Sequence, residues 1–489
     1  MTRAEDQVLA RLGGRRDRHH DLQGATKKWA FVLAGTALLA VALPLNSGGA
    51  SRPSTVLDPG FGVNGVVTTA TAPGAGADLQ NGLALQRDGR ILVGGESEVN
   101  GGFAWRITRY TRDGTLDDSF GNGGTVLTNM SSVGGFDERL ISIAVQRDGK
   151  IVAAGFVLTG PDSQDSALAR YNVDGSLDTA FGTGGKVVTN VASEPSHDFI
   201  NKVLIDHKGR IVVAGGCARI FVGRYLPDGT LDPSFDADGA RPGLRIDVVA
   251  QEGETGAELL GLAIDHHGRL IGAGYATVLD AGSEKVNTAV VRYTPDGRLD
   301  PSFNTDGPHP GTVITSIAPD GGWNVAFRVA IDDHDRVLTA GDAFVGVGAG
   351  LYDIALSRYT PAGTIDRSFG TSGTTLVNGG RGDSDDDAQG LLVQPDNSII
   401  VGGSAAPTAF TLDSDFMVAR FLPDGALDAS FGERGIAKTP TAPGVADDEI
   451  WAIALQREGK VIASGECDQP VTGRDVCVAR YDVAPRGPA

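Results

Sequence analysis

The chain has 489 residues, of which 70 are glycine and 41% are hydrophobic. No Gly-X-Y period is present, so this composition excludes collagen and a wholly disordered chain. Lysine and arginine number 42 against 61 aspartates and glutamates, a net charge of −19. A surface this negative repels phosphate backbones, and nucleic acid is therefore not an expected partner. Three cysteines are too few to build a disulfide scaffold.

The N-terminus predicts that the rest of the chain is exported. Residues 1–28 carry an excess of positive charge, and residues 29–45 (WAFVLAGTALLAVALPL) carry none. Seventeen residues lie at the lower limit for a bilayer span, about 17 to 25, and also suit a signal peptide. Because basic flanks stay in the cytoplasm, we expect residues 1–28 there and the chain after the apolar segment outside. The protein is then secreted, or anchored to the outer face of the membrane by residues 29–45 alone.

After a linker at 46–56, residues 57–482 contain one unit repeated seven times, and 483–489 form a tail. The first mark of the repeat is LDPGF at 57, which returns as LDDSF at 116, LDTAF at 177, LDPSF at 231 and 299, IDRSF at 365 and LDASF at 427. A second mark is an arginine followed by an aromatic residue. A third is a polar turn before an apolar run, such as QRDGKIVAAG at 146. Such self-similarity is typical of repeat architectures.

Each unit predicts four short strands, here called A to D. In residues 140–191 they are expected at 140–146, 150–155, 166–172 and 186–191, separated by turns rich in glycine and aspartate. Four-stranded units of this kind are the blades of a β-propeller. A linear β-solenoid is the alternative, but its coils are usually shorter, roughly 20 to 30 residues.

The two ends of the array are complementary. Residues 65–70 form a strand D with no A, B or C before it, whereas the last unit, 450–481, ends without a strand D. Pairing these ends closes a ring without a free edge. We therefore predict an all-β, seven-bladed propeller closed by its N-terminal strand and preceded by a signal or anchor helix.

The repeat marks resemble the delta-60 repeat family, a tandem repeat of exported bacterial proteins. The resemblance rests on LDTAFGTGG at 177–185, QRDGKIVAAG at 146–155 and ALARY at 167–171. It implies a repeat fold outside the cytoplasm and brings no catalytic residues. Blades four and five depart most from the family pattern, with DADGARPG and NTDGPHPG in place of FGxxG.

An arginine of strand C and an aspartate of the next LDxxF lie eight residues apart in six units, and the chain ends supply a seventh combination. The pairs are Arg109–Asp117, Arg170–Asp178, Arg224–Asp232, Arg292–Asp300, Arg358–Asp366, Arg420–Asp428 and Arg480–Asp58. A ring of arginines can bind anions. We favour structural bridges, because the guanidinium fork fits a carboxylate.

The A–B and C–D connections vary little, whereas the D–A and B–C connections differ in every blade. In an up-and-down blade the latter two emerge on one face, here called the variable face; the other is the scaffold face. At one register before strand A the blades carry Asp78, Glu138, Asp198, Ala257, Asn324, Asp386 and Asp448. Such oxygens at the channel mouth can hold Ca²⁺ or a cationic ligand. Alternatively, each carboxylate caps the backbone of its own turn.

No HExxH, GxSxG or phosphate-loop motif is present, so we expect neither a catalytic site nor a metal or cofactor other than Ca²⁺. The first hypothesis is a monomeric, non-enzymatic module that binds a cell-envelope polymer or a surface protein through its acidic variable face. The rival hypothesis is an extracellular hydrolase or lyase that uses acidic residues at the channel mouth.

Two of the three cysteines lie in the seventh unit. Cys467 follows strand B, and Cys477 lies within strand C. Neighbouring antiparallel strands bring facing Cβ atoms to about 4 to 5 Å, so a disulfide is predicted. Cys217 has no partner in its own unit and is predicted to be a buried thiol.

Overall fold

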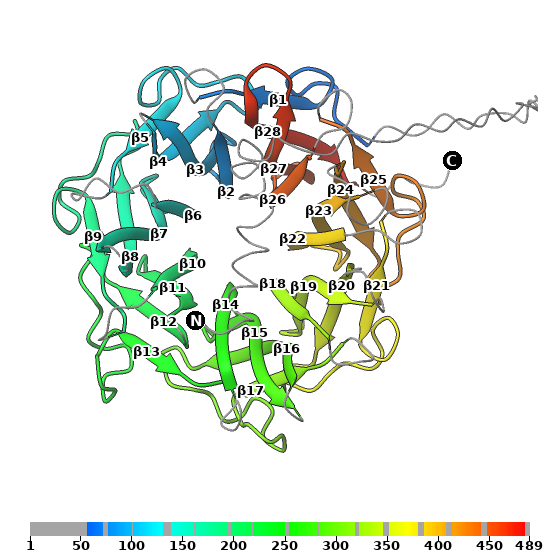
Figure 1. Cartoon of the computed structure of the whole chain (residues 1–489). Helices are drawn as coiled ribbons and strands as arrows, with labels where there is room; N and C mark the ends of the chain where they lie inside the picture. The colour runs from blue at the N-terminus through cyan, green and yellow to red at the C-terminus, as the bar shows by residue number, and fades with distance from the viewer. Residues whose placement is uncertain are drawn as a thin grey trace, which may run out of the picture. The chain divides into compact units, whose positions relative to one another are not determined.

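A computed structural model of the chain describes residues 56–71, 77–99, 101–130, 138–160, 163–192, 197–217, 219–249, 254–280, 283–317, 322–345, 352–379, 386–406, 413–441 and 447–484. Within these residues 28 strands form seven four-stranded antiparallel sheets, and no helix occurs. The sheets stand radially around a central axis (Figure 1). The described part of the chain is thus a seven-bladed β-propeller.

The strands of each blade are named here in their order from the axis outward. Blades one to three contain β2 (Asp78–Leu85), β3 (Ile91–Val99), β4 (Gly102–Tyr110), β5 (Thr125–Thr128); β6 (Arg139–Val145), β7 (Ile151–Gly160), β8 (Ser163–Tyr171), β9 (Lys186–Thr189); and β10 (Phe199–Ile205), β11 (Ile211–Gly216), β12 (Ile220–Tyr225), β13 (Leu244–Asp247). Blades four and five contain β14 (Glu254–Ile264), β15 (Leu270–Asp280), β16 (Ser283–Tyr293), β17 (Thr312–Thr315); and β18 (Asn324–Ile331), β19 (Val337–Phe344), β20 (Tyr352–Tyr359), β21 (Thr374–Val377). Blades six and seven contain β22 (Asp386–Val393), β23 (Ile399–Ala405), β24 (Asp415–Phe421), β25 (Ile436–Thr439); and β26 (Glu449–Leu455), β27 (Lys460–Gln469), β28 (Gly473–Asp482), β1 (Val66–Thr69).

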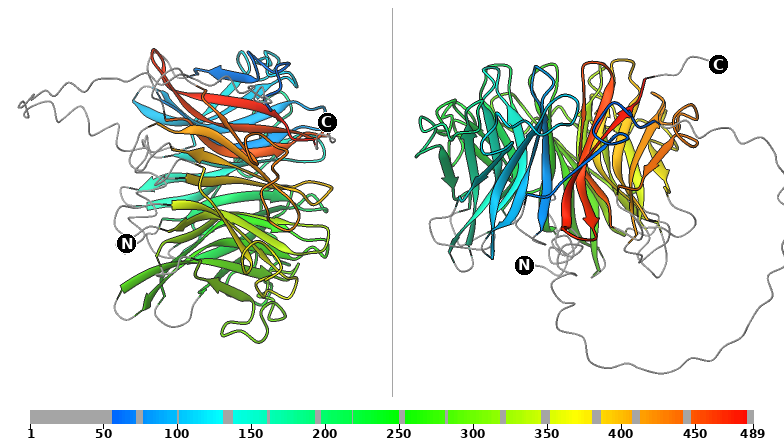
Figure 2. Two further views of the ribbon diagram at one scale, coloured as in Figure 1. Left: turned by 90° about the vertical axis from the view of Figure 1, so that its right-hand side faces the viewer. Right: turned by 90° about the horizontal axis from the view of Figure 1, so that it is seen from above.

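The position of a strand in its blade determines its burial pattern. The two middle strands of blade three, β11 and β12, are buried at every residue because neighbouring blades cover both of their faces. The outermost strands, such as β9, are covered only in part. These outer strands have only four residues each, which limits the unpaired edge that every blade presents to solvent (Figure 2).

Blade seven joins the two ends of the described chain. Strand β1 pairs antiparallel with β28, with Val66 opposite Ala479 and Thr69 opposite Val476. The lone strand predicted at 65–70 therefore lies in the last blade, beside the C-terminal strands (Figure 1). The ring is closed by hydrogen bonds of the same kind that hold each other blade together.

Three strands of blade two differ in length from the prediction. Strands β7 and β8 extend to a Gly160–Ser163 pairing, because a hairpin beyond the core needs no apolar face to continue its ladder. Strand β9 ends at Thr189 rather than 191, and the amide of Val191 instead donates to Asp198 at 2.6 Å. A β-bulge that the sequence did not predict interrupts all seven innermost strands at the same register.

Candidate functional site

The seven predicted arginine–aspartate pairs lie together on the scaffold side of the blades, buried between neighbouring sheets. The nitrogen–oxygen distances are 2.8 Å in Arg109–Asp117, 2.7 Å in Arg170–Asp178, 2.7 Å in Arg224–Asp232, 2.8 Å in Arg292–Asp300, 2.8 Å in Arg358–Asp366, 3.0 Å in Arg420–Asp428 and 2.7 Å in Arg480–Asp58. We call these residues the arginine ring. Its seventh pair joins the two chain ends.

Each arginine also binds the next blade, a contact that the sequence did not predict. Arg224 donates to the Pro295 carbonyl of blade four at 2.6 Å, and Arg480 donates to the Arg112 carbonyl of blade one at 2.8 Å. In six blades the guanidinium also lies over the phenylalanine of LDxxF, 4.5 to 4.9 Å from the ring centre. The accepting carbonyl always follows strand C of the next blade; it is that of Val483, after β28, for Arg420. A proline recurs at this place in four blades, which is the signal that could have revealed the contact.

Each arginine of the ring is held by several contacts inside the protein. Arg109 donates to Asp117, Ser119 and the carbonyl of Val173. Burial alone raises the pKa of the Asp117 carboxyl, but hydrogen bonds from Ser119 and the charge of Arg109 lower it below its ordinary value. The carboxylate is held in its charged form, as a structural ion pair requires.

The predicted carboxylates before strand A are buried, and each binds the backbone of the loop that precedes it. The amides that donate to them are Thr71 to Asp78 at 2.5 Å, Met130 to Glu138 at 2.7 Å, Val191 to Asp198 at 2.6 Å, Gly379 to Asp386 at 2.6 Å and Thr441 to Asp448 at 2.8 Å. Asn324 instead donates to the carbonyls of Gly322 and Val286. Ala257, at the same register, is buried. This geometry is that of loop caps.

Three carboxyls near the variable face have raised pKa values. Burial raises the pKa of Asp353, Asp415 and Asp475. The nearby charge of Asp78 raises that of Asp475 further, while a hydrogen bond from Thr472 opposes the shift. These residues lie at or near the first residue of the third strands β20, β24 and β28, in blades five to seven. The sequence analysis missed them because it aligned the starts of strand A only.

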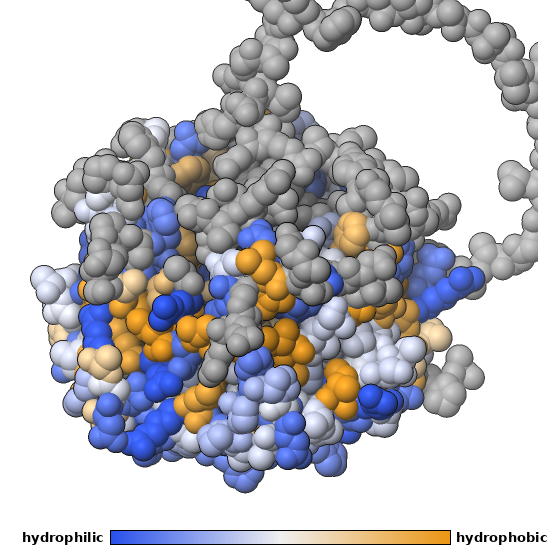
Figure 3. Space-filling model, turned by 60° about the horizontal axis from the view of Figure 1, so that its bottom comes forward, coloured by the Kyte–Doolittle hydropathy of each residue, from blue (hydrophilic) through white to orange (hydrophobic). Residues whose placement is uncertain are grey.

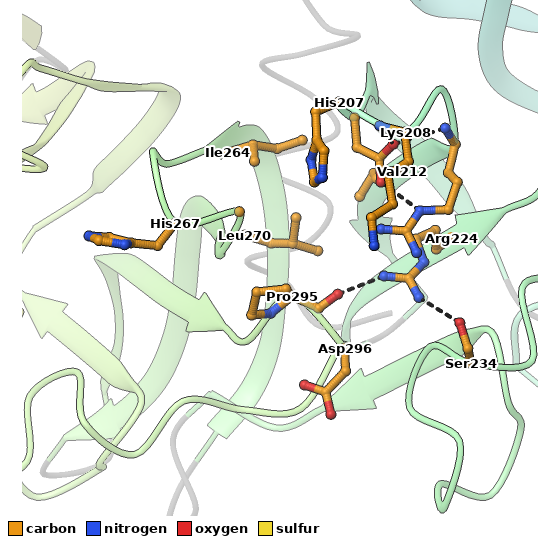
Figure 4. A pocket seen from close by; sticks show the side chains of 13 residues that line it. His207, Lys208, Val212, Arg224, Ser234, Ile264, His267, Leu270, Pro295 and Asp296 are labelled. Atoms are coloured by element: carbon orange, nitrogen blue, oxygen red, sulfur yellow. Dashed lines mark hydrogen bonds and ion pairs between the residues drawn. The ribbon is translucent and has the colours of Figure 1, made fainter.

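A hollow lies on the scaffold side between blades three and four. It has a volume of about 300 Å³ and is lined by His207, Lys208, Arg224, His267 and Asp296, among others (Figure 4). Arg224 of blade three donates to the Pro295 carbonyl of blade four and to the Ser234 hydroxyl of its own blade. The charged groups here belong to the arginine ring, to A–B turns or, for Asp296, to the C–D connection of blade four, and Arg224 links the two blades.

Within the described residues, one group of three side chains could hold a metal. Asp332, Asp333 and His334 lie in the turn between β18 and β19, with ligand atoms within 4.8 Å of one another. Asp332 is already bound by the amides of His334 and Arg336 and by the Arg336 guanidinium. The turn therefore explains the Asp332 carboxylate without a metal.

Cys467 and Cys477 form a disulfide with a Cα–Cα distance of 5.8 Å. Cys467 lies within β27 rather than after it, and Cys477 faces Gly465, so the two cysteines are diagonal neighbours across the β27–β28 ladder. Cys217 is a buried free cysteine, and burial raises the pKa of its thiol to about 12.

The predicted signal or anchor at residues 29–45 lies outside the described residues. In the part that is described, no helix is long and apolar enough to cross a membrane. Apolar residues on the surface seen in Figure 3 occur in several groups divided by polar residues. Three exposed apolar residues, Leu127, Val188 and Leu376, lie in the outermost strands β5, β9 and β21.

One known family model matches parts of six of the repeats. The family model of a domain of unknown function, the DUF5122 beta-propeller, matches residues 86–120, 146–181, 209–235, 268–303, 335–369 and 394–431. This match is consistent with a repeat β-propeller family. Each matched segment runs from an A–B turn to an LDxxF motif or its neighbours, so it contains the arginine–aspartate pair of that blade.

No curated protein matches the chain. Solved structures similar to it include a protein of unknown function from Dyadobacter fermentans, at 11% identity and a TM-score of 0.42, covering 86% of this chain and 100% of that one. An ulvan lyase from a new polysaccharide lyase family has 9% identity and a TM-score of 0.45, with coverages of 85% and 96%. An α-L-arabinanase of Penicillium chrysogenum has 11% identity and a TM-score of 0.41, with coverages of 85% and 98%.

Proposed function

We propose that this protein is an exported binding module of the delta-60 repeat type, which binds a cell-envelope polymer or a surface protein through its variable face. The observation that carries the proposal is the unequal length of the B–C hairpins. Strands β15 and β16 have 11 residues each, whereas β11 and β12 have six each. The scaffold face repeats the same turns in every blade. A rigid ring that varies on one face is suited to present individual contacts there.

The charges of the variable face support a partner with cationic groups. Glu284 is exposed at the start of β16, and Asp413 is half-buried before β24. The buried carboxylates before strand A bind the backbone of their own loops. Contacts with a partner are therefore expected from surface acids such as these two. We further propose that Ca²⁺ bridges the variable face to its partner, because carboxylate oxygens are the ligands that Ca²⁺ prefers.

The test is cosedimentation of the full chain, in mild detergent, with isolated cell-wall polymer, and crosslinking to envelope proteins with and without Ca²⁺. We expect binding that weakens with added salt and with the double substitution Glu284→Gln and Asp413→Asn. The matched control, Asp306→Asn with Glu433→Gln, removes two exposed acids from the scaffold face of the same two blades. Equal loss in both variants would contradict a role of the variable face.

A second candidate function is an extracellular hydrolase or lyase. It is favoured by Asp475, a buried carboxyl with a raised pKa beside Asp78, because a protonated acid near a carboxylate is the combination that glycoside chemistry uses. The test is the release of sugars or unsaturated products from anionic and neutral polysaccharides. Asp475→Asn abolishes this activity if the candidate is correct and leaves binding to the polymer unchanged.

A further inference from the structure

A cavity of about 150 Å³ lies on the axis of the propeller. All seven innermost strands line it, each at or beside its β-bulge, through residues such as Asn81, Ser142 and Asn201. Neighbouring innermost strands pack against each other all around the axis, β26 against β2 included, so the cavity belongs to the whole ring (Figure 1). About five waters fit in this volume, at about 30 Å³ each, and so does one tetrahedral oxyanion.

The residue that follows the bulge is small in five of the seven blades. It is Gly82, Ser142, Gly261, Gly390 or Ala452 in blades one, two, four, six and seven, and Lys202 or Arg328 in blades three and five. A Cβ atom on Gly390 would lie 2.6 Å from Ile453, which shows how closely the strands approach there. Two long cations thus occupy a register that otherwise holds small side chains.

These two cations lack the carboxylate partners that buried arginines have elsewhere in the ring. Arg328 donates to two carbonyls, of Phe327 and Trp451, both at 2.9 Å. Among the described residues Lys202 has no hydrogen-bond or ion-pair partner. Asp387 acts on Arg328 only through its charge at a distance. Burial and the charge of Arg328 lower the pKa of Lys202 to about 8, as expected for two nearby cations without a counter-ion.

A neutral donor completes the arrangement. Gln389, the bulge residue of blade six, lines the same cavity and is 5% exposed, and no described residue is a hydrogen-bond partner of its side-chain amide. Gln389 is buried, whereas Lys202 and Arg328 are partly exposed to the cavity, and no carboxylate lines it. Donors from three blades thus meet at one hollow that holds no acidic acceptor, and a buried amide normally has a hydrogen-bond partner. An anion accepts from these donors and neutralises the charge.

We propose that the axial cavity binds a small oxyanion of the size of phosphate or sulfate, held by Lys202, Arg328 and Gln389. The protein as a whole repels anions through its net charge of −19. Selection of the ion therefore rests on the contacts inside the cavity. The site is independent of the variable face and of the function proposed for that face.

The test is isothermal titration of the full chain, in mild detergent, with inorganic phosphate and with sulfate at constant ionic strength, in a chloride buffer. We expect one saturable site in the wild type and at least a tenfold weaker affinity in Lys202→Met. Lys438→Met, which removes an exposed lysine of β25, is the matched control and binds as the wild type does. Gln389→Leu weakens binding by a smaller factor.

Two results would overturn the proposal: no saturable binding of either oxyanion to the wild type, or equal affinities of the wild type and Lys202→Met. A measurement on the unmodified chain guards against a misfolded variant. Crystals soaked in selenate are expected to show an anomalous peak between Lys202 and Arg328, and a cavity without such a peak contradicts the site.

Discussion

Cations line two regions of this propeller, and their surroundings differ: those of the arginine ring are buried, whereas Lys202 and Arg328 are partly exposed to the axial cavity. In the arginine ring every guanidinium lies within 2.7 to 3.0 Å of a carboxylate and also binds the next blade. In the axial cavity Lys202 and Arg328 have no such carboxylate. A buried charge costs several kcal/mol unless it is paired. The arginine ring is therefore explained as structure, whereas the two cations of the axial cavity remain available to an anion from outside the chain.

The largest effect is expected from opening the arginine ring at its seventh pair. A chain that begins at residue 75 lacks β1, the Asp58 partner of Arg480 and the Phe61 ring on which Arg480 lies. We expect a loss of at least about 5 kcal/mol in the free energy of unfolding, or aggregation through the exposed edge of β28. A chain that begins at residue 51 is the control. Equal thermal and urea transitions of the two chains would contradict closure by the N-terminal strand.

Substitution of single cations compares the two regions directly. Arg224→Met leaves Asp232 buried without its partner and is expected to cost about 3 to 5 kcal/mol in urea unfolding. Lys202→Met removes an unpaired charge and is expected to leave stability unchanged or to raise it, in a buffer free of oxyanions. A loss of stability in Lys202→Met as large as that in Arg224→Met would show that Lys202 has a structural partner.

The pH dependence of this difference sharpens the comparison. Burial lowers the pKa of Lys202 from its ordinary value of 10.5 to about 8 in the folded protein, so the unfolded chain binds more protons between these two pH values. The stability of the wild type is then expected to rise by about 3 kcal/mol, relative to Lys202→Met, as the pH rises from 8 to 10.5. Unfolding curves of both proteins at each pH measure it. A parallel course of the two curves would contradict the lowered pKa.

A smaller effect is expected from the disulfide, which supports the closing blade without touching the cavity. The bond closes a loop of sequence separation 10, and its removal in Cys477→Ser is expected to cost about 2 to 3 kcal/mol. The same substitution should leave the affinity for phosphate unchanged. Thiol counting on the denatured, unreduced wild type is expected to find one group, Cys217, whereas three would show that the bond does not form.

The propeller was predictable because its signals are local and repeated seven times. LDxxF, the polar turn and the eight-residue spacing of arginine and aspartate each lie within one unit, and the unmatched strands at the ends determine the closure. The contacts between blades, such as Arg224 with Pro295, depend on which surfaces meet in space. No spacing within a unit could reveal them.

The sequence shows the register of the axial residues but not that this register lies at the axis. Four residues before the polar end of strand A, the seven units carry Gly82, Ser142, Lys202, Gly261, Arg328, Gly390 and Ala452. The alignment shows two exceptions to small residues, yet only the common bulge reveals that this register faces the axis. For the carboxylates before strand A, the sequence analysis recognised the common register but not the backbone amides that bind them.

The split of blade seven has a consequence for the order in which the protein can fold. Arg480 and Asp58 are 422 residues apart in the chain, and the strands on either side of this pair complete the last sheet. Contacts of such long range form slowly, because loop closure must precede them. Six blades can assemble as the polypeptide emerges from the ribosome, but the seventh waits for the final strand. Until then β1 has no partner, and an unfinished chain offers it to any other open edge.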